Sequence, residues 1–255
     1  MTYFHVLILA IVEGITEFLP ISSTGHLILT GKLLGLASGE FLKTFDIAIQ
    51  SGAILAVVVL YWRLLLVRRD VLIRVVAAFI PTGILGLVFY KMVKEWLGSP
   101  MVVVWSLAIG GLVLILFERA HQEQSGALDD AGKMSIKTAV AIGFFQALAL
   151  VPGISRAAAT ICGGRYLGLS RRAIVEFSFL LALPTMAAAT GLDLMKHTGE
   201  FSSSQFGQLI FGCAISFVVA LLAIRFLLKY IQRHDFKAFG YYRILIAVAF
   251  WLLVL

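Results

Sequence analysis

Two glutamates stand four residues apart in an otherwise apolar segment near the start of the chain. Glu13 and Glu17 share one face of a predicted helix, where like charges repel and each charge is costly at membrane depth. A divalent cation such as Mg²⁺, which binds one or two carboxylates together with phosphate oxygens, would compensate them, as would protonation or a pair with Arg156. Buried ion pairs that serve packing alone are the less favoured interpretation, because apolar residues could replace them at little cost.

A turn rich in hydroxyl groups follows the glutamates directly. After Pro20 and Ile21, the residues are Ser22, Ser23, Thr24, Gly25 and His26. Backbone N–H groups at the start of a second helix favour anions, so this turn could bind phosphate, although ordinary N-capping by a hydroxyl is the simpler alternative. An imidazole beside hydroxyls and carboxylates favours the functional interpretation, since these are the parts of a nucleophile with a general acid and base.

A second polar break carries the complementary charge. The segment Pro152-Gly153-Ile154-Ser155-Arg156 ends another apolar stretch, and the planar guanidinium of Arg156 suits bidentate binding of phosphate oxygens. Two acids, hydroxyls, a histidine and an arginine on two facing segments predict a phosphorylated substrate. The apolar surroundings predict that the rest of this substrate is a lipid.

The composition of the chain indicates which kind of protein must position these residues. The chain has 255 residues, 60% hydrophobic and only 14% charged, and a mean hydropathy of +0.98, which indicates an all-α polytopic membrane protein and excludes fibrous and disordered classes. Two distant cysteines, Cys162 and Cys213, exclude a disulfide framework. The net charge of +7 is interpreted as flanking charge that orients membrane spans, and nucleic-acid binding is rejected.

Six apolar stretches are long enough to cross a membrane. They lie at about 45–62, 71–90, 101–117, 174–192, 206–228 and 239–255. Segments 4–19 and 136–151 are shorter, since sixteen helical residues reach only about 24 Å of a hydrocarbon core of about 30 Å. Both end in polar residues, so we predict six transmembrane helices plus two re-entrant helical hairpins that face each other.

Basic residues support this topology. One predicted face carries fifteen of them: Arg63, Arg68, Arg69, Arg74, Arg119, Lys133, Lys137, Arg165, Arg171, Arg172, Arg225, Lys229, Arg233, Lys237 and Arg243. The other face carries five: Lys32, Lys43, Lys91, Lys94 and Lys196. With Arg156 set aside as embedded, this asymmetry predicts a cytoplasmic basic face and both termini outside.

A weak internal repeat relates the two breaks. Pro20 and Ser23 match Pro152 and Ser155 at an offset of 132 residues, and Leu34-Gly35-Leu36 matches Leu167-Gly168-Leu169 at an offset of 133. Under the predicted topology the first hairpin enters from outside and the second from the cytoplasm. We therefore expect one integral membrane domain, 1–255, built from inverted repeats at approximately 4–117 and 136–255, with the substrate at their interface.

At these motifs the chain resembles a known family, the undecaprenyl pyrophosphate phosphatases associated with bacitracin resistance. The segment from Val12 to His26 resembles the glutamate-rich first motif of that family, and Pro152 to Arg156 resembles its arginine motif. Further resemblance at Phe45 to Gln50, Glu176 to Leu181 and Ala188 to Leu192 extends it over nearly the whole chain.

The resemblance implies removal of one phosphate from undecaprenyl diphosphate, which regenerates the lipid carrier for peptidoglycan, at a site in the bacterial inner membrane that opens to the outer face. It implies that Glu13 and Glu17 bind Mg²⁺ or Ca²⁺ and manage protons, that Arg156 holds the diphosphate, and that Ser23 or His26 attacks. Ser23 is the preferred nucleophile, with His26 or a glutamate accepting its proton. A water activated by the metal is the competing mechanism.

Further substrate contacts are expected from residues beside the catalytic ones, namely Ser22, Thr24, Gly25, Gly153, Ser155 and Thr160. The family's second motif usually continues Ser-Arg-Ser-Gly-x-Thr, whereas here Ala157 and Ala158 follow Arg156, so Thr160 is the remaining hydroxyl. A flippase or other carrier of prenyl phosphate lipids is the alternative function, and two extra negative charges beside Ser23 argue against it. The oligomeric state, a homo-oligomer included, stays open.

Overall fold

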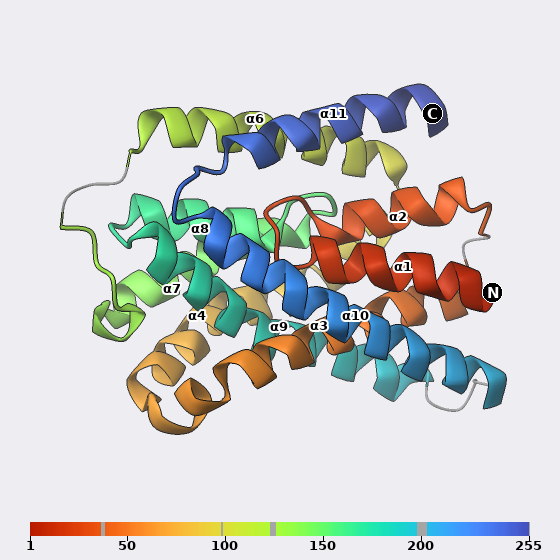
Figure 1. The fold of residues 1–255 in the computed structure, drawn as a ribbon, viewed down its shortest axis with the longest axis horizontal. Helices are drawn as coiled ribbons and strands as arrows, with labels where there is room; N and C mark the ends of the chain where they lie inside the picture. Colours follow the sequence, from red (N-terminus) through yellow and green to blue (C-terminus); the bar gives the residue numbers. More distant parts are fainter. Residues whose placement is uncertain (37–38, 98, 123–125, 198–202, 255) are drawn as a thin grey trace.

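The protein is all-helical in the part that the structure describes. The computed structural model describes residues 1–36, 39–97, 99–122, 126–197 and 203–254, and helices joined by turns account for most of them (Figure 1). Within these ranges the only β pairing is an isolated bridge between Leu128 and Leu169. The predicted all-α class is confirmed.

The helices follow one another in two series. Those of the first series are α1 (Tyr3–Thr16), α2 (Ser23–Leu33), α3 (Glu40–Val67), α4 (Arg69–Val88), α5 (Tyr90–Leu97) and α6 (Pro100–Ala120). The short 3-10 helix η1 (Ala131–Lys133) precedes the second series, which comprises α7 (Ile136–Ala147), η2 (Leu148–Leu150), α8 (Arg156–Tyr166), α9 (Arg171–His197), α10 (Ser203–Tyr230) and α11 (Lys237–Val254).

Five helices are long and apolar enough to cross a membrane. The segments are Thr44–Val67, Arg69–Val88, Pro100–Ala120, Arg171–Gly191 and Gln205–Tyr230. They confirm five of the six predicted apolar stretches as helices of sufficient length. The sixth stretch, 239–255, forms most of α11, its last residue lies outside the described part, and its role as a crossing stays a prediction.

The two shorter apolar segments each form a helix that breaks and is followed by another helix. Helix α1 ends at Thr16 and α2 begins at Ser23, while α7 ends at Ala147 and α8 begins at Arg156. In Figure 1 the α1–α2 pair occupies the right half of the molecule and the α7–α8 pair the left half. The two helix pairs therefore lie at opposite ends of the molecule.

Helices of the first series pack against helices of the second series. Helix α10 packs against α1, and α4 packs against α7. Helices α3 and α9 contact each other, and α6 pairs with α11 along the top of Figure 1. The largest apolar core surrounds the first break, where the Phe18 and Phe179 rings meet edge to face at 5.4 Å between centroids. This core fixes the ends of both hairpins relative to the long helices.

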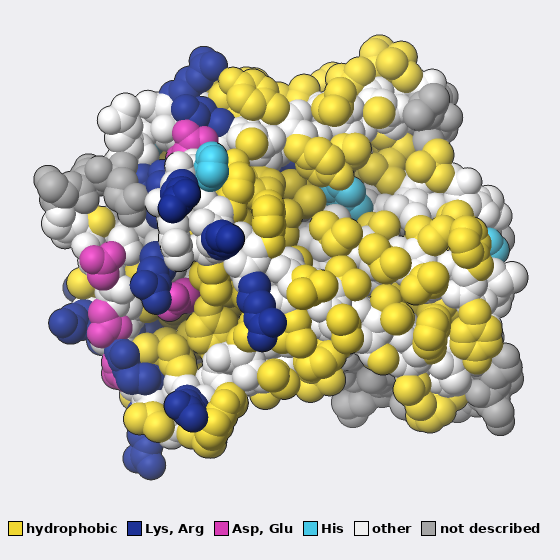
Figure 2. Space-filling view, viewed as in Figure 1, with side chains coloured by type: hydrophobic (Ala, Val, Ile, Leu, Met, Phe, Trp, Pro, Cys, Tyr) yellow, Lys and Arg dark blue, Asp and Glu magenta, His cyan; other side chains and the backbone are white. Residues whose placement is uncertain are grey.

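Charged side chains gather at one end of the face that Figure 2 shows. Figure 2 shows Lys and Arg at the left of this face, where Figure 1 has the α3–α4, α8–α9 and α10–α11 connections, and both termini lie at the right. The charge count assigned Arg243 to the basic end, and this was wrong, because its side chain is buried and contacts Pro20 and Gly153. The side chains of Lys43, Lys94 and Lys196 lie outside the described part.

Candidate active site

The break after α1 holds Ser23 through an unusual backbone conformation. Ile21 donates its N–H to the carbonyl of Leu19 at 2.7 Å, which reverses the chain direction. Ser22 follows with φ 72°, the only positive φ of a described residue other than glycine. Its hydroxyl accepts a bond from the Gly25 N–H at 3.4 Å and caps α2. Strain of this kind persists where the surrounding structure enforces it, and here it makes Ser23 the first residue of α2.

A chain of contacts joins the two breaks. The Ser23 Oγ donates to Oε2 of Glu17 at 2.5 Å, and Nη2 of Arg156 donates to Oε1 of the same carboxylate at 3.1 Å. All three side chains are buried. A hydroxyl that donates a short bond to a carboxylate has a base positioned to accept its proton. The prediction that the two breaks face each other is confirmed.

The turn and the helix cap of the second break position Arg156. Gly153 has φ 92°, and an added Cβ would lie 2.8 Å from the Val103 carbonyl oxygen, so only glycine fits this turn against α6. The Ser155 hydroxyl accepts a bond from the Ala158 N–H at 3.2 Å and caps α8, and it lies 3.5 Å from the Leu19 carbonyl oxygen across the interface. Arg156 is therefore presented by the first turn of α8.

The guanidinium of Arg156 is held on three sides. Nη1 donates to the Ser178 carbonyl at 2.8 Å, and the Ser178 hydroxyl bonds to that of Thr160 at 2.7 Å. The Phe18 ring lies under the guanidinium, 5.8 Å from its carbon to the centroid. Thr160, expected to bind substrate, is fully buried, bonds to the Arg156 carbonyl and thereby supports the arginine from within α8.

The arrangement suits a phosphate group because two helices begin at it. Ser23 starts α2 and Arg156 starts α8, and the Glu17 carboxylate links them. Helix N-termini carry a partial positive charge and N–H groups without intrahelical partners, both of which favour anions. Thr24 is half-buried in the first turn of α2, and Gly25 donates to Ser22, so the predicted phosphate-binding turn is the start of this helix.

Glu13 is fully buried, and neither carboxylate oxygen has a hydrogen-bond partner among the described residues. Its electrostatic neighbours include the carboxylates of Glu17 and Asp46 as well as Arg156. A buried carboxylate that forms no ion pair with a described residue and lies beside a second carboxylate fits a divalent cation, which takes one or two carboxylates plus substrate oxygens. No cluster of three or more His, Cys, Asp or Glu side chains able to hold a metal by themselves occurs in the described ranges.

His26 lies one turn beyond Ser23 but bonds elsewhere. Its Nδ1 is 2.8 Å from the Ser22 carbonyl oxygen, and its Nε2 is 2.9 Å from the Tyr242 hydroxyl. A carbonyl only accepts, so Nδ1 donates, and in this tautomer Nε2 accepts a hydrogen bond from the Tyr242 hydroxyl. The hydrogen bond of Ser23 goes to Glu17, which leaves Glu17 better placed than His26 as the base.

Three residues that the sequence analysis did not assign to the site contribute to it. Ser178 supports Arg156, Tyr242 bonds to His26, and Arg243 contacts both breaks. A sequence signal existed for Arg243, which stands several residues inside an apolar stretch, where an ionisable residue indicates function. A single serine or tyrosine in such a stretch carries no comparable signal.

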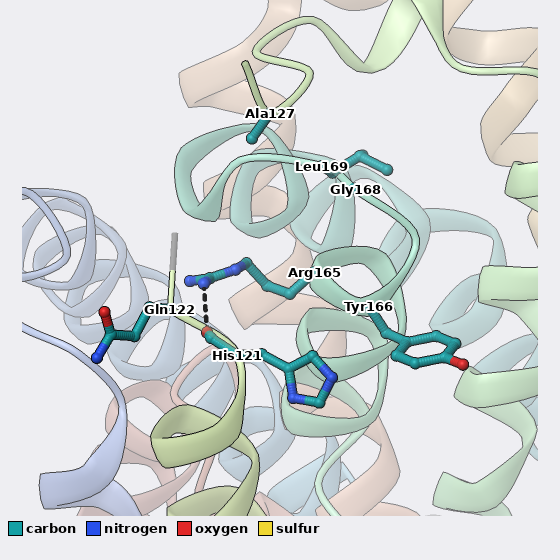
Figure 3. A pocket seen from close by; sticks show the side chains of 7 residues that line it. All are labelled: His121, Gln122, Ala127, Arg165, Tyr166, Gly168 and Leu169. Carbon is teal, nitrogen blue, oxygen red and sulfur yellow. Dashed lines mark hydrogen bonds between the residues drawn. The ribbon is translucent and has the colours of Figure 1, made fainter. Parts of the chain in front are cut away.

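A separate small cavity lies at the basic end. It is lined by His121, Gln122, Ala127, Arg165, Tyr166, Gly168 and Leu169 (Figure 3). In this view Arg165 points toward the backbone of His121, to whose carbonyl oxygen its Nη2 donates at 2.8 Å. None of the predicted site residues lines this cavity.

Comparison with known proteins identifies the family. The family model described as bacitracin resistance protein BacA matches residues 6–249. The chain belongs to the BacA family. This BacA-family chain is 48% identical over 251 residues to a protein of Aquifex aeolicus and 49% identical over 252 residues to one of a Sulfurihydrogenibium species, each covering at least 98% of both chains. A relative from Wolinella succinogenes is 47% identical over 250 residues, covering 98% of this chain and 97% of its own.

All three relatives are named undecaprenyl-diphosphatase. The resemblance inferred from the two motifs is thereby confirmed. With its apolar helices, this BacA-family member is a multi-pass membrane protein.

Proposed function

We propose that this protein is a membrane phosphatase that hydrolyses undecaprenyl diphosphate to undecaprenyl phosphate and inorganic phosphate. The reaction recycles the lipid carrier used for peptidoglycan. The observation that carries the proposal is the contact chain from Ser23 through Glu17 to Arg156, which joins a hydroxyl, a base and a guanidinium in one buried place. The names of its close relatives support the choice of substrate.

In the proposed reaction Ser23 attacks the terminal phosphorus in line. A bond forms from Oγ to phosphorus as the bond from phosphorus to the bridging oxygen breaks, and undecaprenyl phosphate leaves with that oxygen. Glu17, which already accepts a hydrogen bond from Oγ, takes the serine proton. Arg156 holds the phosphate oxygens and balances their charge, which is the main requirement of phosphoryl transfer.

Water then attacks the phosphoserine. Glu17 returns its proton to Oγ as the phosphorus–Oγ bond breaks, inorganic phosphate leaves with the oxygen of the water, and one proton passes to solvent. Direct attack of water on the diphosphate is the alternative path. A protein-bound label from diphosphate carrying ³²P at its terminal position, absent in Ser23→Ala, is expected for the serine path. Turnover by Ser23→Ala at the wild-type rate would support direct attack of water.

Glu13 and Glu17 would hold the Mg²⁺ or Ca²⁺ that we propose as cofactor. Such a cation, when bound, neutralises phosphate charge and the repulsion between the two glutamates. The support is the buried Glu13 carboxylate, which has no hydrogen-bond partner in the described part of the chain.

We further propose that six helices cross the bacterial inner membrane and that α1–α2 and α7–α8 are re-entrant hairpins of inverted repeats at approximately 4–117 and 136–255. Support comes from the opposed hairpins, from both termini lying at one end and from basic side chains at the other (Figures 1 and 2). The positive-inside rule then makes the basic end cytoplasmic, with the termini and the opening of the site outside.

The test is phosphate release from undecaprenyl diphosphate by purified protein in detergent. We expect release by the wild type that stops with EDTA and returns with Mg²⁺ or Ca²⁺, and losses of at least about 10³-fold in Ser23→Ala and Arg156→Ala. Ser170→Ala is the matched control, because Ser170 is a buried helix-capping serine at the start of α9, outside the contact chain. Well-folded wild type that binds the lipid yet releases no phosphate would overturn the proposal and favour a carrier.

A further inference from the structure

Arg243 is a buried arginine whose partners are all carbonyl groups. Only 1% of the residue is exposed. Nη1 donates to the Pro20 carbonyl at 3.4 Å, and Nη2 donates to the carbonyls of Gly153 and Ser106, each at 3.1 Å. Nε donates to the Leu107 carbonyl at 3.4 Å. One guanidinium from α11 therefore contacts both breaks and α6.

The carbonyls of Pro20 and Gly153 stand where helical hydrogen bonding is interrupted. In an apolar interior such groups need a donor, because an unpaired carbonyl costs several kcal/mol. Each is also three residues before a residue of the contact chain, Ser23 in the first break and Arg156 in the second. A donor that spans both carbonyls sets the separation of the two turns and hence the position of Arg156 relative to Ser23.

We propose that Arg243 is a positioning residue of the phosphatase, holding the Pro20 and Gly153 turns at the spacing that aligns Arg156 with Ser23. The inference rests on the proposed function. Among the described residues, Arg243 donates its hydrogen bonds to backbone carbonyls and none to Glu17, Ser23 or Arg156. Its five donors in a fixed fork suit this role, whereas the ammonium of lysine is a single point that cannot reach carbonyls on three segments.

Helix α6 leaves room for this guanidinium. A Cβ added at Gly110 would lie 2.1 Å from Nη2 of Arg243. A methyl group there must displace the guanidinium, although Gly110 itself lies outside the contact chain. At Gly86, a helical glycine of α4, an added Cβ would meet only Leu150, at an ordinary 3.5 Å. Gly110→Ala and Gly86→Ala are therefore a matched pair.

The experiment measures kcat, KM and melting temperature of purified variants in detergent, with undecaprenyl diphosphate as substrate. We expect Arg243→Met to lower kcat about 100-fold and Arg243→Lys about tenfold, because displacement of the reacting groups by about 1 Å has effects of this size. Gly110→Ala is expected to lower kcat by about tenfold with little change in KM, and Gly86→Ala to leave kcat unchanged.

Arg165→Met controls for a purely structural effect. Arg165 is a buried arginine at the basic end that also donates to a backbone carbonyl, so its loss should lower the melting temperature without lowering kcat. The inference is overturned if Arg243→Met and Gly110→Ala turn over at the wild-type rate below their melting temperatures, or if Arg165→Met lowers kcat equally. Inactive wild type would instead refute the proposed function.

Discussion

Two buried charge clusters of the molecule differ in the balance of their charges. The cluster proposed to be catalytic, called the catalytic cluster below, comprises Glu13, Glu17, Ser23 and Arg156, with two carboxylates for one guanidinium. The basic-end cluster comprises Glu118, Arg165 and Arg171, in which one carboxylate lies between two guanidiniums at 3.9 and 3.2 Å. The acids of both clusters are buried, so burial alone does not distinguish a functional site from a structural ion pair.

The difference lies in what remains uncompensated. In the basic-end cluster the buried acid has a cation on either side. In the catalytic cluster one acid, Glu13, forms no ion pair with a described residue, and the other accepts a 2.5 Å bond from a serine. Uncompensated charge is destabilising and persists where a ligand completes it. The contrast supports the proposal that the catalytic cluster binds a substrate and a cation, whereas the basic-end cluster stabilises the fold.

Exchanging a glutamate for glutamine in each cluster gives the largest expected effects and tests this contrast directly. Glu17→Gln removes the proposed base of Ser23 and the ion-pair partner of Arg156, so phosphate release should fall by about 10³-fold. Its melting temperature should change little, because loss of one negative charge beside Glu13 offsets the lost ion pair. Phosphate-release assays and thermal melts in detergent measure the two quantities.

Glu118→Gln is the counterpart and should show the opposite pattern. It leaves two arginines without their shared carboxylate, a loss of about 3 kcal/mol for a buried pair, while kcat below the melting temperature stays at the wild-type value. The contrast fails if Glu118→Gln is as inactive as Glu17→Gln at a temperature where both are folded.

Tyr242→Phe tests a residue next to the catalytic cluster, because Tyr242 contacts His26. Removing the hydroxyl frees Nε2 of His26 and should lower kcat about fivefold, the value of one hydrogen bond. The neighbouring Tyr241 is the control, because its hydroxyl accepts a bond only from Arg119 at the protein surface in the described contacts, so Tyr241→Phe should retain full activity. A loss of 10³-fold in Tyr242→Phe would instead make His26 the main base.

Much of the site was predictable because charged residues within apolar segments carry a large desolvation cost. Glu13, Glu17 and Arg156 interrupt apolar segments, and the proline and glycine next to them mark the breaks. Local sequence therefore located both turns, and helix length separated the two short segments from the long ones. The ion pair of Glu17 with Arg156 requires the two breaks to meet, and the bond of Ser23 to Glu17 requires the turn after α1 to fold back on itself; the tertiary structure establishes both.

The contributions of α11 escaped prediction for a physical reason. The charge count treats an arginine near a helix end as exposed, and Arg243 lies seven residues into α11, close to the basic end in sequence. Its burial depends on carbonyls supplied by Pro20, Ser106 and Gly153, which are distant in sequence. Hydropathy is calculated from side chains alone, so it cannot predict which backbone carbonyls lack a hydrogen-bond donor.

The smallest expected effect concerns the polar surface of the basic end. Asp130 accepts bonds from Nη2 of Arg68 at 2.7 Å and from the Gly132 N–H at 2.8 Å. The Arg68 hydrogen bond, and then that of Gly132, hold the pKa of Asp130 below its ordinary value. A lowered native pKa means that ionised Asp130 stabilises the fold above the unfolded pKa of about 4, and that this contribution is lost as the pH falls through the native value.

Asp130→Asn should therefore melt slightly below the wild type at neutral pH, by an amount limited by solvent screening of a partly exposed pair. The gap should shrink below about pH 4, as Asp130 of the wild type becomes protonated, and activity at neutral pH should be unchanged. Asp129→Asn is the control, since this exposed neighbour should melt as the wild type does. A difference in melting temperature that stays constant down to the lowest pH would mean that the Asp130 side chain acts through its shape and not its charge. Loss of phosphatase activity in Asp130→Asn would contradict the contrast between the two ends of the molecule.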